Sequence, residues 1–269
     1  MDLFTRSRKG KEPAFTGSTL ILPIVSLANV AQLSADLLIH SLNLKNVGSL
    51  AAKYHIPVVS PIDYVEGRPN ELGFATAVEV FQSEDRSLTL IQQRSPVIKS
   101  RKDAFIQALV AFVRNAGFQR ILVVAGMDAG LLDHFDNPSP FRYLITEDST
   151  LKAGFGSIMA PLDVSSPDLT PNHIPLLPSS GITRRLLSSL LSSSAEFSGD
   201  HIDIASLLMF VAEGDNRADA HALARCVVKG LEVGVREEDW KEPISWRIGL
   251  YGEELGKESA EGGPAELYG

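Results

Sequence analysis

The last three residues of the chain, Leu267, Tyr268 and Gly269, combine an aliphatic side chain, a phenol and a terminal carboxylate. Leucine offers apolar surface and tyrosine an aromatic body with a hydrogen-bonding tip, while a carboxylate accepts charge-assisted hydrogen bonds from lysine or backbone N–H groups. The preceding residues, 253–266, are rich in Glu and Gly, so they bury too little apolar surface to fold alone. These features predict a flexible arm that docks into a pocket on another protein, although an ordinary frayed terminus has the same composition.

Two further places carry side chains that could catalyse a reaction or hold a metal. Glu213 and Asp215 flank a glycine between an apolar strand and a helix, where α/β enzymes often place acids. Together with Asn216 they also form a turn and a helix N-cap, the interpretation that we favour. Residues 133–136 (Asp-His-Phe-Asp) lack a second His or Cys at a useful spacing, which favours a solvated loop over a metal site.

Established catalytic motifs are absent from the sequence. It has no Walker-type Gly-Lys-Ser/Thr loop, no Gly-x-Gly-x-x-Gly after a strand and no Gly-x-Ser-x-Gly nucleophile elbow. Residues 154–156 (Gly-Phe-Gly) lack a third glycine and are interpreted as a flexible loop. Cys226, the only cysteine, lies in an apolar helical stretch, which favours packing over a reactive thiol. We therefore expect no cofactor and no metal.

The composition is ordinary for a soluble globular protein. With 269 residues, 44% hydrophobic and 22% charged, the chain can form one sizeable α/β core or two small domains. A formal net charge of −8 does not favour a nucleic-acid or anionic-membrane partner. Without a membrane-length apolar run or a signal-peptide core, and with one cysteine, the chain is expected to be intracellular.

Charge is distributed unevenly along the chain. Residues 237–269 hold nine acidic side chains against three basic ones, whereas the N-terminus is basic. The basic residues before Gly17 are Arg6, Arg8, Lys9 and Lys11. We expect a flexible basic arm at 1–17, which is a solvated tail, a docking arm or a weak nuclear signal, and a flexible acidic tail at 253–269.

Strand and helix patterns alternate between these two ends. Buried strands are predicted at 19–25, 121–126 and 204–212, and an antiparallel hairpin at 74–82 and 88–94. Apolar residues at helical spacing predict helices at 30–42, 105–116, 182–191 and 216–233. The sequence therefore predicts an α/β fold, a single domain at 18–252 with a central mixed β-sheet flanked by helices.

Local signals mark where some of these elements begin and end. Asn29, with Gln32 three residues later, is expected to cap the first helix, and Asp215 or Asn216 the last. Gly117 occupies a plausible position just beyond the second helix. Residues 161–178 contain five prolines and should be largely irregular.

Five blocks of the sequence, taken together, resemble the proteasome assembly chaperone 2 family. They are Thr19–Gly48, Ser139–Thr146, Gly181–Thr183, Leu207–Asn216 and Ser245–Arg247. The blocks follow the family's order and reach from residue 19 to about residue 251. Two of them contain aromatic residues beside an arginine (Phe141, Arg142 and Tyr143; Trp246 and Arg247), which serve either the core or an interface.

The resemblance implies a non-enzymatic, ATP-independent chaperone of the cytoplasm and nucleus. Family members pair with proteasome assembly chaperone 1 as a heterodimer, which binds the outer face of the 20S proteasome α-subunit ring, promotes its assembly and hinders off-pathway association. A C-terminal hydrophobic-Tyr-any residue motif of the family enters pockets between α-subunits. Leu267 would then fill an apolar slot, Tyr268 would fix orientation, and the Gly269 carboxylate would pair with a pocket lysine.

Two other functions are compatible with the same pattern. A nucleoside-phosphorylase-like α/β enzyme would need a phosphate-binding set and a carboxylate to recognise the base. Glu213 and Asp215 are the only candidate acids for recognising the base, and Arg184 or Arg185 are the nearby candidate cations. The chain could also be an adaptor for another ring-shaped machine that receives the same tail.

Overall fold

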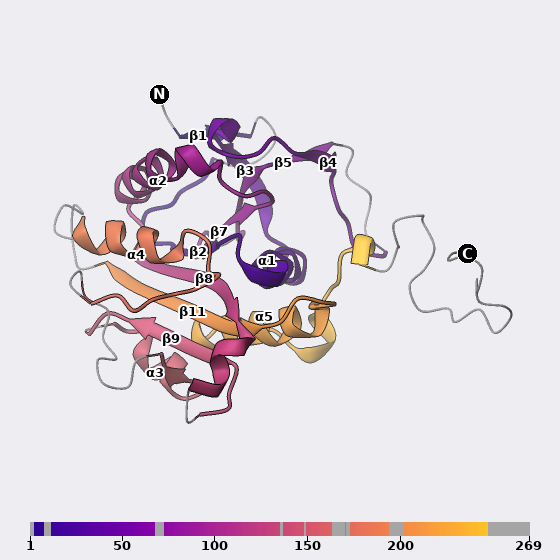
Figure 1. Cartoon of the computed structure of the whole chain (residues 1–269). Coiled ribbons are helices and arrows are strands. Elements are labelled where there is room, and N and C mark those ends of the chain that lie inside the picture. Colours follow the sequence, from indigo (N-terminus) through magenta and orange to yellow (C-terminus); the bar gives the residue numbers. More distant parts are fainter. Residues whose placement is uncertain are drawn as a thin grey trace, which may run out of the picture.

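The structure is a computed structural model, and it describes residues 3–7, 12–67, 73–134, 137–147, 149–162, 170, 173–193 and 202–246. For residues 133 and 134 only the backbone is described. Within these ranges, nine strands form one mixed sheet in the order β1-β3-β6-β7-β2-β8-β11-β9-β10 (Figure 1). The strands are β1 (Phe4–Arg6), β2 (Thr19–Pro23), β3 (Lys45–Leu50), β6 (Val78–Gln82), β7 (Leu88–Gln93), β8 (Arg120–Asp128), β9 (Phe141–Ile145), β10 (Ala160–Pro161) and β11 (Asp203–Val211).

The middle of this sheet is parallel and buried on both faces. β2 runs parallel to β7 and β8, and β8 runs parallel to β11. Every residue of β2 and of β11 is buried. Because helices cover both faces, these strands are continuous apolar runs, as the sequence predicts for 19–25, 121–126 and 204–212.

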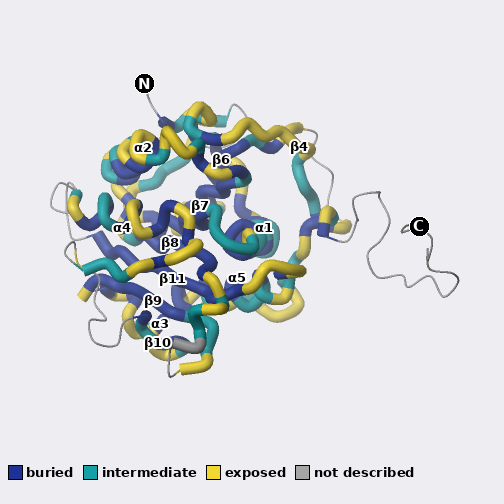
Figure 2. The backbone as a smooth tube through the Cα atoms, viewed as in Figure 1, coloured by how far each residue is buried: buried dark blue, intermediate teal, exposed yellow. Residues whose placement is uncertain are grey.

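Helices form a layer on each side of the sheet (Figure 1). They are α1 (Val30–Ser41), α2 (Lys102–Ala116), α3 (Lys152–Gly156), α4 (Thr183–Ser192) and α5 (Arg217–Gly230), with 3₁₀ turns at 27–29, 52–54, 99–101, 129–134, 237–239 and 244–246. The buried side chains of α2 and α4 join one apolar cluster, and those of α1, α3 and α5 join the other. Figure 2 shows buried residues along the central strands and exposed segments at the periphery. The predicted single α/β domain with a mixed sheet flanked by helices is confirmed.

The hairpin at 74–94 is confirmed only in part. β6 and β7 pair antiparallel, with Val78 opposite Gln93 and Gln82 opposite Thr89. Phe74–Thr76, which the sequence assigns to the same strand as β6, is instead a separate strand, β5. It pairs antiparallel with β4 (Val59–Pro61) in a two-stranded sheet, here called the ribbon.

Two expectations about helix ends have opposite outcomes. Gly117 adopts φ +74° directly after α2, the left-handed conformation that glycine provides at low cost, so the predicted stop is confirmed. Asn29 precedes α1 but has φ +52° instead of the extended conformation of a capping residue, and its side chain makes no capping bond. The predicted cap by Asn29 is therefore wrong.

The N-terminal segment is more ordered than its charge suggests. Phe4–Arg6 forms β1, an edge strand antiparallel to β3. Leu3 is buried, and the ring of Phe4 packs against Phe15 and Phe112. The prediction of a flexible arm over 1–17 is wrong for residues 3–6, because Leu3 is buried and the half-buried Phe4 packs against Phe112 of α2.

The predicted C-terminal docking residues lie outside the described part of the chain. Description stops at Trp246, so Arg247, the acidic tail at 253–269 and the triplet Leu267, Tyr268 and Gly269 remain sequence-based expectations. Among the helices that the structure describes, none combines the length and the apolar character needed to cross a membrane.

Candidate functional site

The last described segment, residues 237–246, is bonded to three separate parts of the domain, and we call it the strap. The backbone N–H of Lys241 donates to the Ser41 hydroxyl at 2.9 Å, and that of Ile244 donates to the Tyr64 carbonyl at 2.8 Å. The carbonyl of Trp246 accepts a 2.9 Å hydrogen bond from Nη1 of Arg217. These bonds fix the point at which the C-terminal tail begins.

Aromatic packing strengthens the attachment of the strap to α5. The ring of His221 lies 6.1 Å from both Trp240 and Trp246, edge to face, and its Nε2 is 2.8 Å from Glu242. Arg225 lies over the Trp240 ring at 5.8 Å. Trp246 is buried in the cluster formed with α1 and α5, so it serves the core rather than an exposed interface.

The tail begins near the carboxyl edge of the parallel strands. α5 follows β11 directly, and Arg217, which holds the Trp246 carbonyl, is the first residue of that helix. In α/β folds this edge is where ligand and partner sites are most often built. Trp246, the last described residue, is therefore anchored at this edge of the sheet.

Residues 213–216, which include the acids Glu213 and Asp215, form a turn between β11 and α5, as the favoured interpretation predicts. Asp215 accepts hydrogen bonds from the backbone N–H and guanidinium of Arg217, and this hydrogen bonding lowers the pKa of Asp215 to about 2. Asn216 occupies the cap position but donates its amide to the carbonyls of Ala212 and Gly214. A carboxylate that stays ionised at neutral pH and is held by a cation is poorly suited to general acid–base work.

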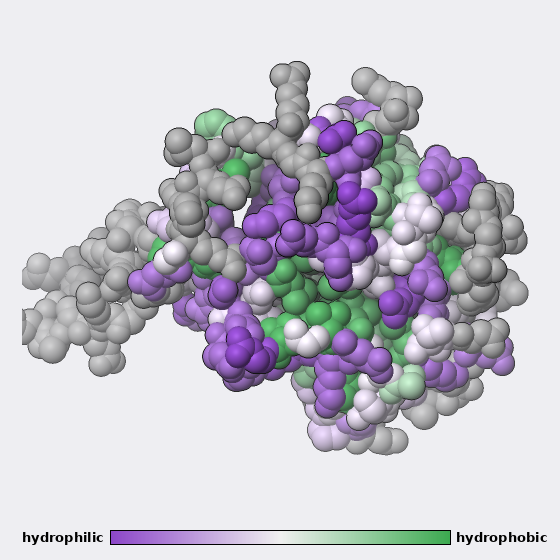
Figure 3. All heavy atoms as spheres, turned by 180° about the vertical axis from the view of Figure 1, so that it is seen from behind, coloured by the Kyte–Doolittle hydropathy of each residue, from purple (hydrophilic) through white to green (hydrophobic). Residues whose placement is uncertain are grey.

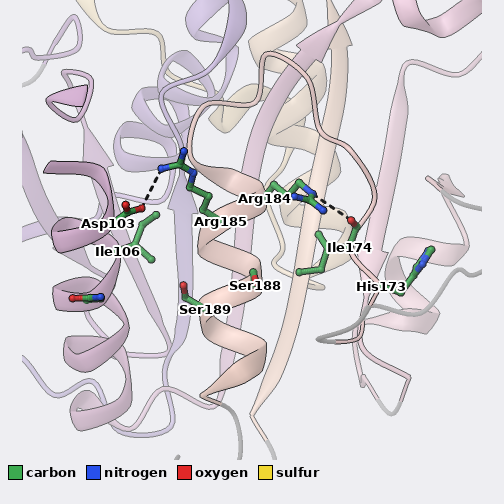
Figure 4. Close-up of a pocket in the computed structure, with 9 residues that line it drawn as sticks. Asp103, Ile106, His173, Ile174, Arg184, Arg185, Ser188 and Ser189 are labelled. Carbon is green, nitrogen blue, oxygen red and sulfur yellow. Dashed lines mark hydrogen bonds and ion pairs between the residues drawn. The ribbon is translucent and has the colours of Figure 1, made fainter. Parts of the chain in front are cut away.

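The arginines of the rival enzyme hypothesis lie elsewhere, in a groove between α2 and α4 (Figure 4). Arg185 pairs with Asp103 at 3.1 Å, and Nε of Arg184 donates to the carbonyls of Ile174 and Pro175. The cavity here has a volume of about 440 Å³, and neither Glu213 nor Asp215 lines it. The structure thus does not bring the candidate acids and cations together in this groove.

Arg142 is a structural residue. Its side chain is 1% exposed, its guanidinium donates to the carbonyls of Asn137 and Phe141, and it stacks over the Phe210 ring at 5.6 Å. Burial lowers the pKa of Arg142. Arg142 thus connects the segment that precedes β9 with the strand β11. This favours the core role over the interface role.

A largely buried charge network between α1 and the sheet was not foreseen from the sequence. Arg94 lies 3.2 Å from Asp36 and 3.3 Å from Glu79, and Gln92 donates to Asp36 at 2.9 Å. Burial raises the pKa of both carboxyls, while Arg94 opposes that shift. The pairing of β6 with β7 brings Glu79 close to Arg94, and the packing of α1 against β7 adds Asp36.

The remaining candidates have packing roles or lie outside the described side chains. Residues 154–156 belong to α3 and not to a flexible loop, so that prediction is wrong. Gly154 allows α3 to approach α5 closely, because a Cβ at this position would lie 2.5 Å from the Gly230 carbonyl. Burial raises the pKa of Cys226 to about 11, consistent with the predicted inert thiol. Nothing is described of the side chains at 133–136, and the described residues contain no group of three potential metal ligands.

Comparison with known proteins extends these observations. The sequence profile of the PAC2 family matches residues 20–226. Proteasome assembly chaperone 2 of Xenopus laevis is 32% identical over 91% of this chain and 96% of its own length. The human protein of that name is 30% identical over 90% of this chain and 95% of its own length.

Solved structures share the fold at low sequence identity. The crystal structure of Pyrococcus furiosus PbaA, an archaeal homolog of proteasome-assembly chaperone, has a TM-score of 0.58 and 14% identity, covering 85% of this chain and 88% of its own. The crystal structure of Pyrococcus furiosus PbaB, an archaeal proteasome activator, has a TM-score of 0.53 and 17% identity, covering 88% of this chain and 92% of its own. The architecture is therefore that of a PAC2-like α/β domain. From the family match and the relatives, the chain belongs to the PAC2 family.

Proposed function

We propose that this chain is a proteasome assembly chaperone that acts by protein–protein binding and not by catalysis. The observation that carries the proposal is similarity over about nine-tenths of the chain to proteins named proteasome assembly chaperone 2. The turn at 213–216 and the groove between α2 and α4 agree with it, because they do not assemble the acids and cations of the enzyme hypothesis.

The proposed working form is a heterodimer with proteasome assembly chaperone 1, in the cytoplasm and nucleus. In this proposal the heterodimer binds the α-subunits of the 20S proteasome, promotes formation of their ring and blocks off-pathway association. The chain then needs two surfaces, a large one for the partner subunit and one for the ring. No nucleic acid and no membrane take part.

The ring surface in this proposal includes the C-terminal triplet Leu267, Tyr268 and Gly269. Trp246, the last residue of the strap, is held by Arg217, and residues 247–269 would reach at most about 80 Å if fully extended. Tethering raises the effective concentration of a short motif at its pocket, so a modest pocket affinity adds usefully to domain contacts. The terminal carboxylate contributes through a charge-assisted hydrogen bond.

A pull-down with matched tyrosine variants tests both parts of the proposal. We would compare the full chain, a chain lacking residues 267–269, Tyr268→Ala, and the control Tyr251→Ala, which alters an internal Leu-Tyr-Gly triplet without a free carboxylate. The expected result is recovery of α-subunits and a second chaperone by the full chain and the control, with fewer α-subunits for the other two. Equal recovery of α-subunits by all four would remove the docking role, and recovery of no proteasome subunit by any would contradict the chaperone function.

The pull-down also tests the adaptor function, and a separate activity assay tests the enzyme function. Recovery of subunits from a different ring would support the adaptor. Phosphorolysis or hydrolysis in a nucleoside panel that is lost in Glu213→Gln would support the enzyme. We expect neither.

A further inference from the structure

The ribbon formed by β4 and β5 exposes an apolar surface that the fold does not need. Consecutive residues 56–61 (Ile-Pro-Val-Val-Ser-Pro) are all exposed, including Val59 at 68%. On the neighbouring strand Phe74 is 73% exposed. Runs of exposed apolar residues are unfavourable in water, so they persist where a function needs them.

The register of the ribbon explains which side chains face outward. Val59 lies opposite Thr76 and Pro61 opposite Phe74, so these pairs share one face, while Ser60 and Ala75 share the other. Ala75 is 4% exposed, so the ribbon is covered by the domain at Ala75, although Ser60 on the same face is exposed. The outward face would be polar in a ribbon that contacts only water, yet here it carries valine, proline and phenylalanine.

We propose that the outward face of the ribbon, centred on Val59 and Phe74, is the docking surface for the partner subunit of the heterodimer. This inference rests on the proposed function for the existence of that partner. In Figure 3 hydrophobic side chains also gather over the ribbon, at the upper left, apart from the hydrophobic area at the centre of that face.

The size and shape of the surface point to a folded protein. Phe74 alone exposes on the order of 150 Å², since an aromatic side chain presents roughly 200 Å². With Ile56, Val58 and Val59 it can form the apolar core of an interface that buries about 800 Å² on each partner. These residues do not line the cavities between α2 and α4, so the apolar surface of the ribbon is separate from that groove.

Charge favours a different chain over a second copy. Each copy carries a formal net charge of −8, so two copies repel each other, whereas a partner with a neutral or positive net charge would be free of this repulsion. Basic side chains lie near one end of the apolar run, where Arg101 donates to the carbonyl of Lys53. Asp63 and Glu66 follow β4 at the other end. Such an apolar centre with a charged border is the usual anatomy of a specific protein interface.

The test is co-expression with proteasome assembly chaperone 1, followed by measurement of the dissociation constant for the two purified chains. The variants are Val59→Thr and Phe74→Ser, both full length. Leu176→Ser is the matched control, because Leu176 is 77% exposed but lies outside the ribbon. Thermal unfolding of each variant alone checks that the fold is kept.

We expect about a tenfold or greater loss of affinity for Phe74→Ser, a smaller loss for Val59→Thr and no change for the control. Unchanged affinity in both ribbon variants, or an equal loss in the control, would overturn the assignment of the surface while leaving the heterodimer intact. A wild-type homodimer that Phe74→Ser dissociates would also overturn it, in favour of a second copy. If the wild-type chains do not pair at all, the proposed heterodimer itself fails.

Discussion

β11 and β4 both carry branched apolar residues, but the two strands lie in opposite environments. All nine residues of β11 are buried between two helical layers, whereas all three residues of β4 are exposed. Burial accounts for the apolar residues of β11, since each contributes to the free energy of folding. The apolar residues of β4 contribute little to folding, which is why we assign them to binding.

Truncating one side chain in each strand tests this contrast most directly. Leu207 in β11 is fully buried, so Leu207→Ala should lower the free energy of unfolding by about 2–5 kcal/mol. Val59→Ala should change it by less than about 0.5 kcal/mol. Urea denaturation of both variants measures the difference, and comparable losses would mean that the ribbon belongs to the folding core.

Ion pairs allow the same comparison between buried and exposed sites. Removing the charge with Arg94→Met leaves Asp36 and Glu79 buried without their cation, which should cost about 3 kcal/mol at pH 7. The pKa of both carboxyls would rise further without Arg94, so the cost should shrink as the pH falls and they become protonated.

Arg185→Met is the exposed counterpart of that variant. The side chains of Arg185 and Asp103 are 62% and 80% exposed, so loss of their pair should change stability by less than about 0.5 kcal/mol. Urea denaturation at pH 7 and pH 5 measures both variants. A penalty for Arg94→Met that does not depend on pH would contradict the electrostatic explanation.

His55 should give the smallest of these core effects, one confined to acidic pH. The ring is 1% exposed, packs edge-on against Phe105 and accepts a hydrogen bond from the Gln93 amide, and burial lowers its pKa from 6.5 to about 4. Between pH 6.5 and about 4, His55 becomes protonated in the unfolded chain but stays neutral in the folded chain. The free energy of unfolding should therefore fall by roughly 2–3 kcal/mol between pH 6.5 and 4.

The contribution of His55 is measured against a neutral variant. His55→Gln should lack this part of the pH dependence, and the difference between wild type and variant at each pH isolates it from Asp36 and Glu79, whose raised pKa acts in the opposite direction. If wild type and variant lose stability in parallel over this pH range, His55 is not the titrating group.

Elements with a complete local pattern were predictable from the sequence. β2, β8, β11 and the apolar face of α2 appear where periodicity places them, because both faces of each strand, or one face of the helix, are covered. β1 and the ribbon were missed, because a short strand is defined by a partner distant in the chain. Phe74 continues the apolar pattern of β6, so only the structure separates the two strands.

The functional candidates divide in the same way. The turn at 213–216 and the inert Cys226 follow from local residue types and match the structure. The roles of Arg142 and Trp246 depend on which elements pack around them, so the sequence left core and interface open and the structure decides for the core. The tail triplet stays a prediction.

The parallel centre of the sheet has a consequence for how the chain folds. Thr19 in β2 pairs with Arg120 in β8, and Arg120 also pairs with Asp203 in β11, so the central strands close very long loops. Such non-local pairing slows folding, because loop entropy is lost before the contacts form. During synthesis, one edge of β8 stays unpaired until residues 203–211 have left the ribosome. The nascent chain therefore passes through a stage in which the apolar strand β8 is open to aggregation along one edge.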